Sequence, residues 1–383
     1  MGDGYLFEKN VKGLTCPLDK LKLINESGHM TAKSKVYFLE LDQLDKLPAL
    51  LKTAGIADVV KKDDLAAIKI HFGEKGNKGH IKPKEIKPVI KLAKELGASP
   101  FLTDANTIYR GERTDAVHHL NVAADHEFHL KFLGAPVVIA DGLRGNSYVE
   151  VEVNPLDHAR GKYKHFKKVK IAEAIYYADS MICLTHFKGH ELTGFGGAIK
   201  NLGMGCAARP GKYEQHNSIV PQVQATNCTA CGACIKWCSG EALHLENDQI
   251  VLTPEKCVGC GQCILACNFK VFSLPWNDSS KEVQEKIAEY AAGAVKDKRV
   301  IYVNFINFIT KYCDCFKTVG QPIMPDIGIV VSLDPVAIDQ ASYDLTIKHA
   351  GKDILKEETG TDGSIQLKYA ESLGLGTRQY ELI

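Results

Sequence analysis

The fold is decided by the stretch Leu65-Ala-Ala-Ile-Lys-Ile-His-Phe72 and by the segment from Pro83 to Leu96, which follows it after a polar loop. The first is a short apolar run of the length expected for a buried strand. Pro83 suits the first position of a helix, and Gly97 is typical of the residue that ends one. A strand followed by a helix is the unit from which parallel sheets covered by helices are built.

The same alternation of short β-branched runs and longer helical patterns continues on both sides of this unit. We therefore predict an α/β fold with a mostly parallel sheet and helices on both faces. Further strands are expected at Val36–Leu41, Phe101–Thr103, Pro136–Ala140, Ser180–Thr185, Arg299–Ile306 and Ile327–Ser332, and further helices at Leu44–Val60, Val283–Val295 and Pro335–His349.

One stretch, residues 222–275, breaks the alternation, because it is compact and rich in cysteine and glycine. The α/β pattern resumes behind it. We therefore expect a small inserted α+β module, with residues 31–221 and 276–383 folding together as one α/β domain. Residues 1–30 contain Ser27-Gly28-His29, which suits either a cloning scar or an ordinary N-terminal arm, and we leave them out of the expected fold.

The inserted stretch contains two matching runs of four cysteines, and each run has gaps of two, two and three residues. Three cysteines at two-residue gaps can reach three irons of a [4Fe–4S] cubane, so the fourth ligand must come from elsewhere. In bacterial two-cluster ferredoxins, which this stretch resembles, the last cysteine of each run binds the other cluster. We therefore assign Cys228, Cys231, Cys234 and Cys267 to one cluster, and Cys257, Cys260, Cys263 and Cys238 to the other.

Other uses of these cysteines fit less well. Zinc takes four ligands, usually from paired Cys-x2-Cys hooks with longer spacers. A disulfide framework is typical of short secreted chains rather than of one this long. One departure from the ferredoxin pattern is visible, since Ser239 and Asn268 stand where a proline usually follows the fourth cysteine. A purely structural role for the clusters stays open.

A second dense group of polar residues follows the predicted strand Ser180–Thr185, at the edge where open α/β sheets bind ligands. A helix that begins near Gly197 would direct its amides at an anion. The alternative is that the glycines only form a tight turn. The candidate catalytic residues are His71, His186, Lys188, His190 and Lys200, and the candidate cofactor-binding residues are Gly194, Gly196, Gly197 and Asn201. Asp104, Asn106 and Asp141 stand at two further strand ends.

Two smaller groups leave their roles open. Cys313-Asp314-Cys315, together with Cys206, could hold an additional metal, act as a reactive dithiol or simply be buried thiols. The histidines at 118, 119, 126 and 129 could present metal ligands on one helix face, but ordinary surface histidines fit them better.

The composition narrows the class of protein. The net charge is +1 and no long basic run occurs, so a nucleic-acid partner is not expected. No apolar stretch approaches the ~20 residues that cross a bilayer, and the N-terminal residues lack the apolar core of a secretory signal. These features predict a cytoplasmic protein.

The chain resembles the family known as domain of unknown function 362, whose members often carry a ferredoxin-type insertion. The resemblance rests on the motifs at Lys69–His80, Thr185–Gly205, Tyr312–Cys315 and Asp334–Asp339. The resemblance implies the architecture and the position of the site. It implies no reaction, because no reaction has been agreed for the family.

The motifs together favour an iron–sulfur oxidoreductase component. A redox partner protein would exchange electrons with the two [4Fe–4S] clusters, which would pass them to a flavin, a further metal ion or an anionic substrate at the strand ends. The alternatives are a non-enzymatic electron carrier or adaptor, and a factor that matures metal centres or clusters.

Overall fold

The computed structural model describes residues 33–109, 111–153, 163–216, 220–238, 240–257, 259, 261–273 and 279–383. The proposed extension, residues 1–30, lies outside the described residues, and so does Cys260. Residues 34–383 form one compact unit.

An eight-stranded sheet forms the centre of the protein, with strands in the order β16-β1-β15-β14-β7-β2-β3-β4. The five strands from β14 to β4 run parallel to one another, whereas β15 is antiparallel to both β14 and β1. The sheet is therefore mostly parallel, as expected. The strands are β1 Ser34–Leu39, β2 Leu65–Lys69, β3 Ser99–Asp104, β4 Val137–Ile139, β7 Ser180–His186, β14 Arg299–Ile306, β15 Gly328–Ser332 and β16 Tyr380–Leu382.

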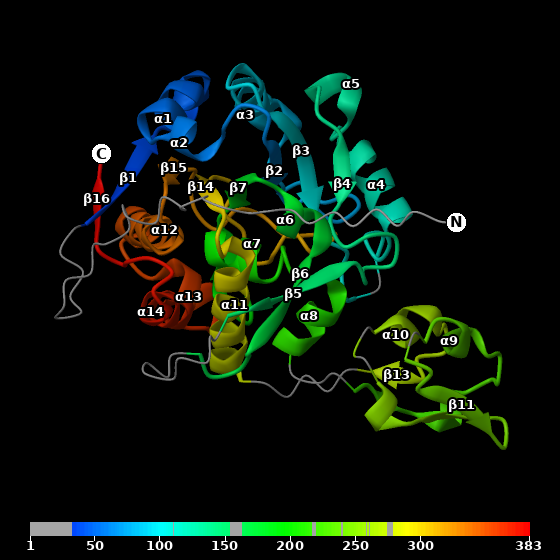
Figure 1. Ribbon diagram of the computed structural model, residues 1–383. Coiled ribbons are helices and arrows are strands. Elements are labelled where there is room, and N and C mark those ends of the chain that lie inside the picture. Colours follow the sequence, from blue (N-terminus) through cyan, green and yellow to red (C-terminus); the bar gives the residue numbers. More distant parts are fainter. Residues whose placement is uncertain are drawn as a thin grey trace, which may run out of the picture. The chain divides into compact units, whose positions relative to one another are not determined.

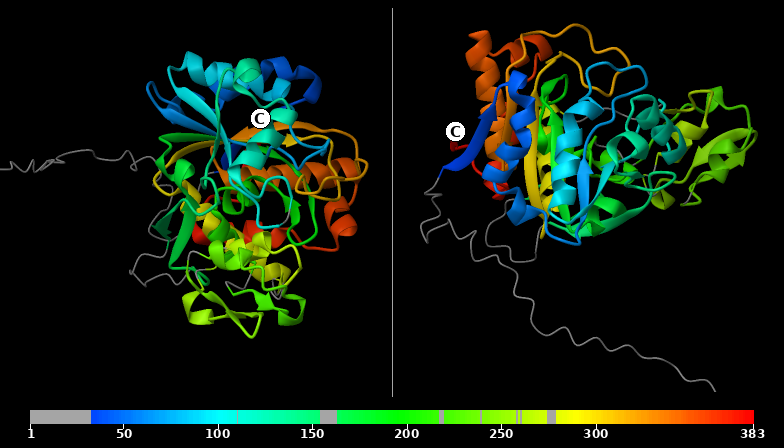
Figure 2. Two further views of the ribbon diagram at one scale, coloured as in Figure 1. Left: turned by 90° about the vertical axis from the view of Figure 1, so that its right-hand side faces the viewer. Right: turned by 90° about the horizontal axis from the view of Figure 1, so that it is seen from above.

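Helices cover both faces of the sheet (Figures 1 and 2). Side chains of a strand point alternately to its two faces, and in β7 Met181 enters one core while Ile182 enters the other. The second core packs against α1 Leu47–Thr53, α2 Ile56–Val59, α3 Pro83–Glu95, α4 Ala116–Asp125 and α5 Leu130–Leu133. The first packs against α6 Glu173–Tyr177, α7 Ala198–Gly203, α11 Ser280–Val295, α12 Pro335–Ala350, α13 Ile354–Thr359 and α14 Ser364–Leu373. The predicted α/β fold is thus confirmed.

The register of the central strands brings their carboxyl ends to one edge. Lys69 in β2 lies beside Cys183 in β7, and His186 at the end of β7 lies beside Phe305 in β14. The segments that follow β2, β7 and β14 therefore leave the sheet close together. This arrangement places the polar motifs of three distant parts of the chain at a common edge.

Some predicted elements differ from the structure in detail. The helix expected over Leu44–Val60 is divided into a 3-10 turn at Leu41–Lys46 and the short helices α1 and α2. Gly55 separates these two helices, because its φ of 95° lies in the left-handed region that ends a helical run. The residues before α7 form a small hairpin of β8 Lys188–His190 and β9 Gly194–Gly196, and another hairpin joins β5 Tyr148–Glu152 to β6 Lys168–Ala172.

The cysteine-rich insert, Gln222–Ser273, lies in the chain between α8 Arg209–Gln215 and α11. Two two-stranded ribbons pair β10 Gln222–Val223 with β13 Phe272–Ser273 and β11 Leu243–Glu246 with β12 Gln249–Leu252. Two short helices, α9 Ala233–Lys236 and α10 Gln262–Ala266, each follow a glycine with positive φ. The insert has an apolar cluster of its own, which includes Cys234 and Cys267.

Candidate functional site

A cavity of about 860 Å³ lies at the carboxyl ends of the central strands. Its wall is built by the loops after β2, β3 and β14, the end of β7, the β8–β9 hairpin, and residues of α7, α8 and α11. A cavity of this size is typical of sites for small molecules. The sequence-derived candidates that line it are His71, His186, Lys188, His190, Lys200, Gly196, Gly197, Asn201, Cys313 and Cys315.

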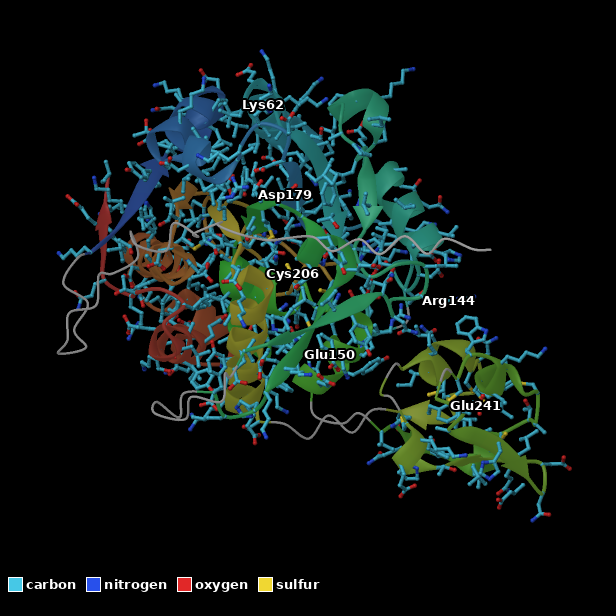
Figure 3. All side chains as sticks on the ribbon, in the orientation of Figure 1. Lys62, Arg144, Glu150, Asp179, Cys206 and Glu241 are labelled. Carbon is cyan, nitrogen blue, oxygen red and sulfur yellow. The ribbon has the colours of Figure 1, made fainter. Side chains whose placement is uncertain are left out.

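Two other candidates lie elsewhere. Gly194 is not part of the cavity wall. A Cβ atom there would lie within 2.6 Å of the backbone of Gly363, and its φ is +72°, so this glycine serves a tight packing contact. Cys206 lies inside the α/β domain (Figure 3), in the apolar core that also contains Cys183. The structure therefore does not bring Cys206 to the cavity wall with Cys313 and Cys315.

The start of α7 differs from the expectation that its amides face an anion. The Asp339 carboxylate accepts hydrogen bonds from Ala198 N at 2.7 Å and from Ile199 N at 2.9 Å. A side chain at Gly197 would collide with the same carboxylate. Burial raises the pKa of Asp339 to about 6, although hydrogen bonds from Ile199 N and Asn304 oppose the rise. A side chain of the protein itself thus caps this helix.

Asp314 anchors the loop after β14 through buried contacts. Its Oδ2 atom is 2.8 Å from His186 Nδ1 and 3.2 Å from Lys188 Nζ, and its backbone oxygen accepts from Glu74 N at 2.9 Å. Burial alone would raise the pKa of Asp314, but His186 and Lys188 outweigh it and hold the pKa well below its ordinary value. The loop is therefore tied to the ends of both β7 and β2.

His186, a candidate catalytic residue, has both ring nitrogens occupied. Nδ1 faces the Asp314 carboxylate, and Nε2 lies 2.8 Å from the backbone oxygen of Asn307. The ring therefore lies between two oxygen atoms of the protein and helps to position Asp314.

Cys313 and Cys315 lie side by side between these anchors. The Cys313 thiol donates to Cys315 Sγ across 3.0 Å, and His71 Nε2 lies 3.5 Å from Cys315 Sγ. The hydrogen bond from Cys313 lowers the pKa of Cys315 well below the ordinary thiol value, and the charges and hydrogen bonds of nearby groups, including His71, add to this effect against burial. The bond to Cys315 and burial raise the pKa of Cys313. The pKa values of the two thiols are therefore pushed apart, with Cys315 the more acidic of the pair.

Two lysines in the cavity wall lack a carboxylate partner within the described chain. Lys200 Nζ has Cys313 Sγ as a neighbour at 4.0 Å, and Lys212 Nζ donates to the backbone oxygen of Asn106 at 2.8 Å. Burial lowers the pKa of Lys212 to about 8, near neutral pH. Burial also lowers the pKa values of His190 and of His216, the latter to about 4, so both rings are neutral. The wall thus offers cations and neutral imidazoles to a ligand, and the carboxylates of Glu74 and Asp104 line the same cavity.

A buried ion network in the cavity wall was not anticipated from the sequence. Asp104, at the end of β3, is 2.9 Å from Lys69 Nζ and 3.4 Å from Arg113 Nη1. Arg113 also approaches Glu74 at 3.4 Å and donates to the Tyr109 hydroxyl. Arg113 lies in a loop without a recognisable motif. Lys69 and His71 alternate with apolar residues near the end of the predicted strand Leu65–Phe72. This pattern was the available signal for the part of the network that contains Lys69.

The four grouped histidines do not form a metal site. His119 is buried against Phe72, whereas His118 is exposed and bonds to Asp115. His126 Nδ1 is 2.7 Å from the backbone oxygen of Phe72, and His129 caps α5. Their separate partners favour structural roles.

In the insert, Cys228, Cys231, Cys234 and Cys267 line one small pocket. Three of them come from the first run and the fourth from the second. Backbone amides approach the sulfurs, since Ala230 N donates to Cys228 Sγ at 3.4 Å and Ala242 N to Cys238 Sγ at 3.2 Å. The donor set and the N–H···S bonds suit an iron–sulfur cluster. The described residues do not include Cys260. Among them, no group of three His, Cys, Asp or Glu side chains lies close enough together to hold a metal ion.

Comparison with known proteins gives few relatives. No curated protein matches the chain. Among solved structures, the lactate racemase apoprotein from Thermoanaerobacterium thermosaccharolyticum is similar with a TM-score of 0.36 and 12% identity, over 72% of this chain and 51% of that one. The chain therefore spans about half the length of that protein. None of the described helices is long and apolar enough to span a membrane.

A family model does match most of the chain. It covers residues 66–344, a range that includes β2, β7, β14, most of the cavity wall and the cysteine-rich insert. The chain therefore belongs to the family described as domain of unknown function, DUF362.

Proposed function

We propose that this chain is an iron–sulfur redox protein that passes electrons through two [4Fe–4S] clusters to an acceptor held in the cavity of the α/β domain. The observation that carries the proposal is the pocket that Cys267 shares with Cys228, Cys231 and Cys234. This is the ligand set that a crossed two-cluster arrangement requires. Cys257, Cys263 and Cys238, with Cys260 outside the described residues, would hold the second cluster.

The clusters would supply electrons one at a time, and the residues of the cavity would prepare the acceptor. Lys200 and Lys212 form no ion pair with a carboxylate in the described chain and therefore suit an anionic group. Lys212, with a pKa of about 8, can hold or release a proton near neutral pH. Neutral His190 offers a further hydrogen-bonding group in the same wall.

Anaerobic purification with iron and sulfide analysis tests the proposal. About eight irons and eight sulfides per chain are expected for two clusters. Lys200→Ala and His190→Ala should keep both cluster signals in electron paramagnetic resonance while they lose electron transfer to the acceptor. A chain that lacks iron and sulfide after anaerobic preparation would contradict the proposal.

The same preparation separates this function from its alternatives. Full iron and sulfide content, with no effect of either cavity variant on electron transfer, would indicate an electron carrier that docks partner redox proteins. A further metal ion or a flavin spectrum would instead identify the acceptor in the cavity. Transfer of the metal or cluster to another protein would indicate a maturation factor.

A further inference from the structure

Cys313 and Cys315 stand in the cavity wall as a pair of adjacent thiols. Their Sγ atoms are 3.0 Å apart, and a disulfide requires about 2.05 Å. A movement of roughly 1 Å would therefore join the two sulfurs. We propose that Cys313 and Cys315 form a dithiol that cycles with an intramolecular disulfide and reduces small anionic disulfides bound in the cavity.

The environments of the two sulfurs assign them different roles. Cys313 is only 2% exposed, whereas Cys315 is partly exposed. Gly73 N donates to His71 Nδ1 at 3.0 Å, so the ring hydrogen resides on Nε2, which faces Cys315 Sγ at 3.5 Å. A donor directed at a sulfur stabilises its thiolate, which is the attacking form. Cys315 is therefore the attacking residue, and the more buried Cys313 is the resolving residue.

The loop between the two cysteines holds them in place. Asp314 is fixed by His186 and Lys188, and its backbone oxygen receives the Glu74 amide. Cys315 N also donates to Cys313 Sγ at 3.4 Å. Because the backbone is anchored on both sides, disulfide closure requires side-chain rotation rather than rearrangement of the loop.

The cavity determines the class of substrate. Lys200 Nζ is 4.0 Å from Cys313 Sγ and, within the described chain, forms no ion pair with a carboxylate. Lys212 lies in the same wall, where its Nζ donates to the backbone oxygen of Asn106 and the charges of Asp141 and Asp104 act on it. A disulfide that carries carboxylates would place them on these ammonium groups. The volume of about 860 Å³ suits a small molecule rather than a folded protein.

The exchange balances in atoms and electrons. The Cys315 thiolate attacks one sulfur of the substrate disulfide, forms a mixed disulfide and releases the first substrate thiolate. Cys313 then loses its proton and attacks Cys315 Sγ, which closes the protein disulfide and releases the second thiolate. The two released thiolates take up the two protons that the cysteines gave up. One substrate disulfide is reduced by two electrons, and the protein dithiol is oxidised by two.

Return of the protein disulfide to the dithiol takes two electrons and two protons. These electrons would come from the cysteine-rich insert, and for this return step alone the inference rests on the proposed function. Two clusters that each carry one electron would together supply the two electrons that reduce one disulfide. The exchange with substrate depends only on the cavity and can be measured separately.

Glutathione disulfide, which is anionic, serves as the probe for the full-length reduced protein under anaerobic conditions. Wild type should release two equivalents of glutathione and form a disulfide between Cys313 and Cys315, detected by peptide mass spectrometry. Cys313→Ser should stop at a mixed disulfide of glutathione with Cys315, and Cys315→Ser should not react. Cystamine, a cationic disulfide, should react about tenfold more slowly than glutathione disulfide.

Cys206→Ala is the matched control, because Cys206 lies in the core away from the cavity wall, and it should react as wild type does. The proposal is overturned if Cys313→Ser forms no mixed disulfide, if cystamine reacts as fast, or if both serine variants lose a bound metal ion instead. Iron and sulfide are measured in the same samples. If the protein has its full iron content but does not exchange with glutathione disulfide, only the dithiol proposal is contradicted. If the protein exchanges normally but contains no iron, only the proposed function is contradicted.

Discussion

His71 presents its Nε2–H to the sulfur of Cys315 at 3.5 Å, although the two residues are separated by 244 positions in the chain. The tautomer is determined by the Gly73 amide, which donates to the other ring nitrogen. Burial lowers the pKa of His71 and keeps the ring neutral. A neutral donor thus stabilises a thiolate in the cavity wall.

Replacing His71 by alanine should make Cys315 less reactive. Loss of the donor raises the pKa of the Cys315 thiol toward its ordinary value, so a smaller fraction is thiolate and its alkylation by iodoacetamide at pH 7 should slow. The pH dependence of the rate, followed by peptide mass spectrometry, checks this. His129→Ala is the control, since His129 only caps α5. An unchanged rate in His71→Ala would show that the ring does not support the thiolate.

Replacing Asp314 by asparagine should destabilise the protein. The change leaves the Lys188 ammonium buried without its counter-charge, which typically costs about 3–5 kcal/mol. Because the pKa of Asp314 is depressed, its contribution is fully present at neutral pH and is lost only below its ordinary pKa near 4. Urea denaturation at pH 7 measures the difference, with exposed Asp297→Asn as the control. Equal stability of Asp314→Asn and wild type would contradict the charge assignment.

Replacing Asp339 by asparagine should change the pH dependence of stability. The folded pKa of about 6 lies above the unfolded value of 3.8, so the folded state binds the proton more tightly. The Asp339 contribution to the free energy of unfolding therefore falls as the pH rises, by about 1 kcal/mol between pH 5 and pH 7. Denaturation at both pH values should show this fall in wild type and its absence in Asp339→Asn. Parallel slopes would mean that Asp339 has an ordinary pKa.

Replacing Cys267 by alanine should affect the cluster of the first cysteine run, because Cys267 lines a pocket with Cys228, Cys231 and Cys234. About four of the eight irons should be lost, and one of two signals should change in electron paramagnetic resonance. The control variant Cys206→Ala should retain both signals. If Cys267→Ala instead disturbed only the cluster of Cys257 and Cys263, the crossed assignment would be wrong.

The sequence predicted the sheet and the edge at which the cavity lies, because both depend on local patterns. The strand Arg299–Ile306 was predicted with its observed bounds. His71, His186 and Cys313 each follow or end a recognisable strand, and parallel strands bring such ends to one edge. The strand ends, together with the glycines beside them, were sufficient to locate this group.

The contacts that give the cavity residues their roles could not be predicted from local sequence patterns. Asp339 caps α7 from 141 positions away, and His186 is held by Asp314 from 128 positions away. Such partners depend on how helices and loops pack against the sheet, which local periodicity does not encode. The division of Leu44–Val60 is a different case, since Gly55 was a visible signal of the break.

The helices on either side of the cysteine-rich insert already touch each other. Tyr290 of α11 donates its hydroxyl hydrogen to Glu214 of α8 at 2.5 Å, and Gly211 packs so closely against the Tyr290 ring that a side chain there would collide with it. The insert therefore stands between two helices that pack on each other. A short linker should close the same gap at little entropic cost, since loop-closure entropy changes slowly with length. The cavity and the strand register should therefore stay as they are when the insert is shortened or exchanged.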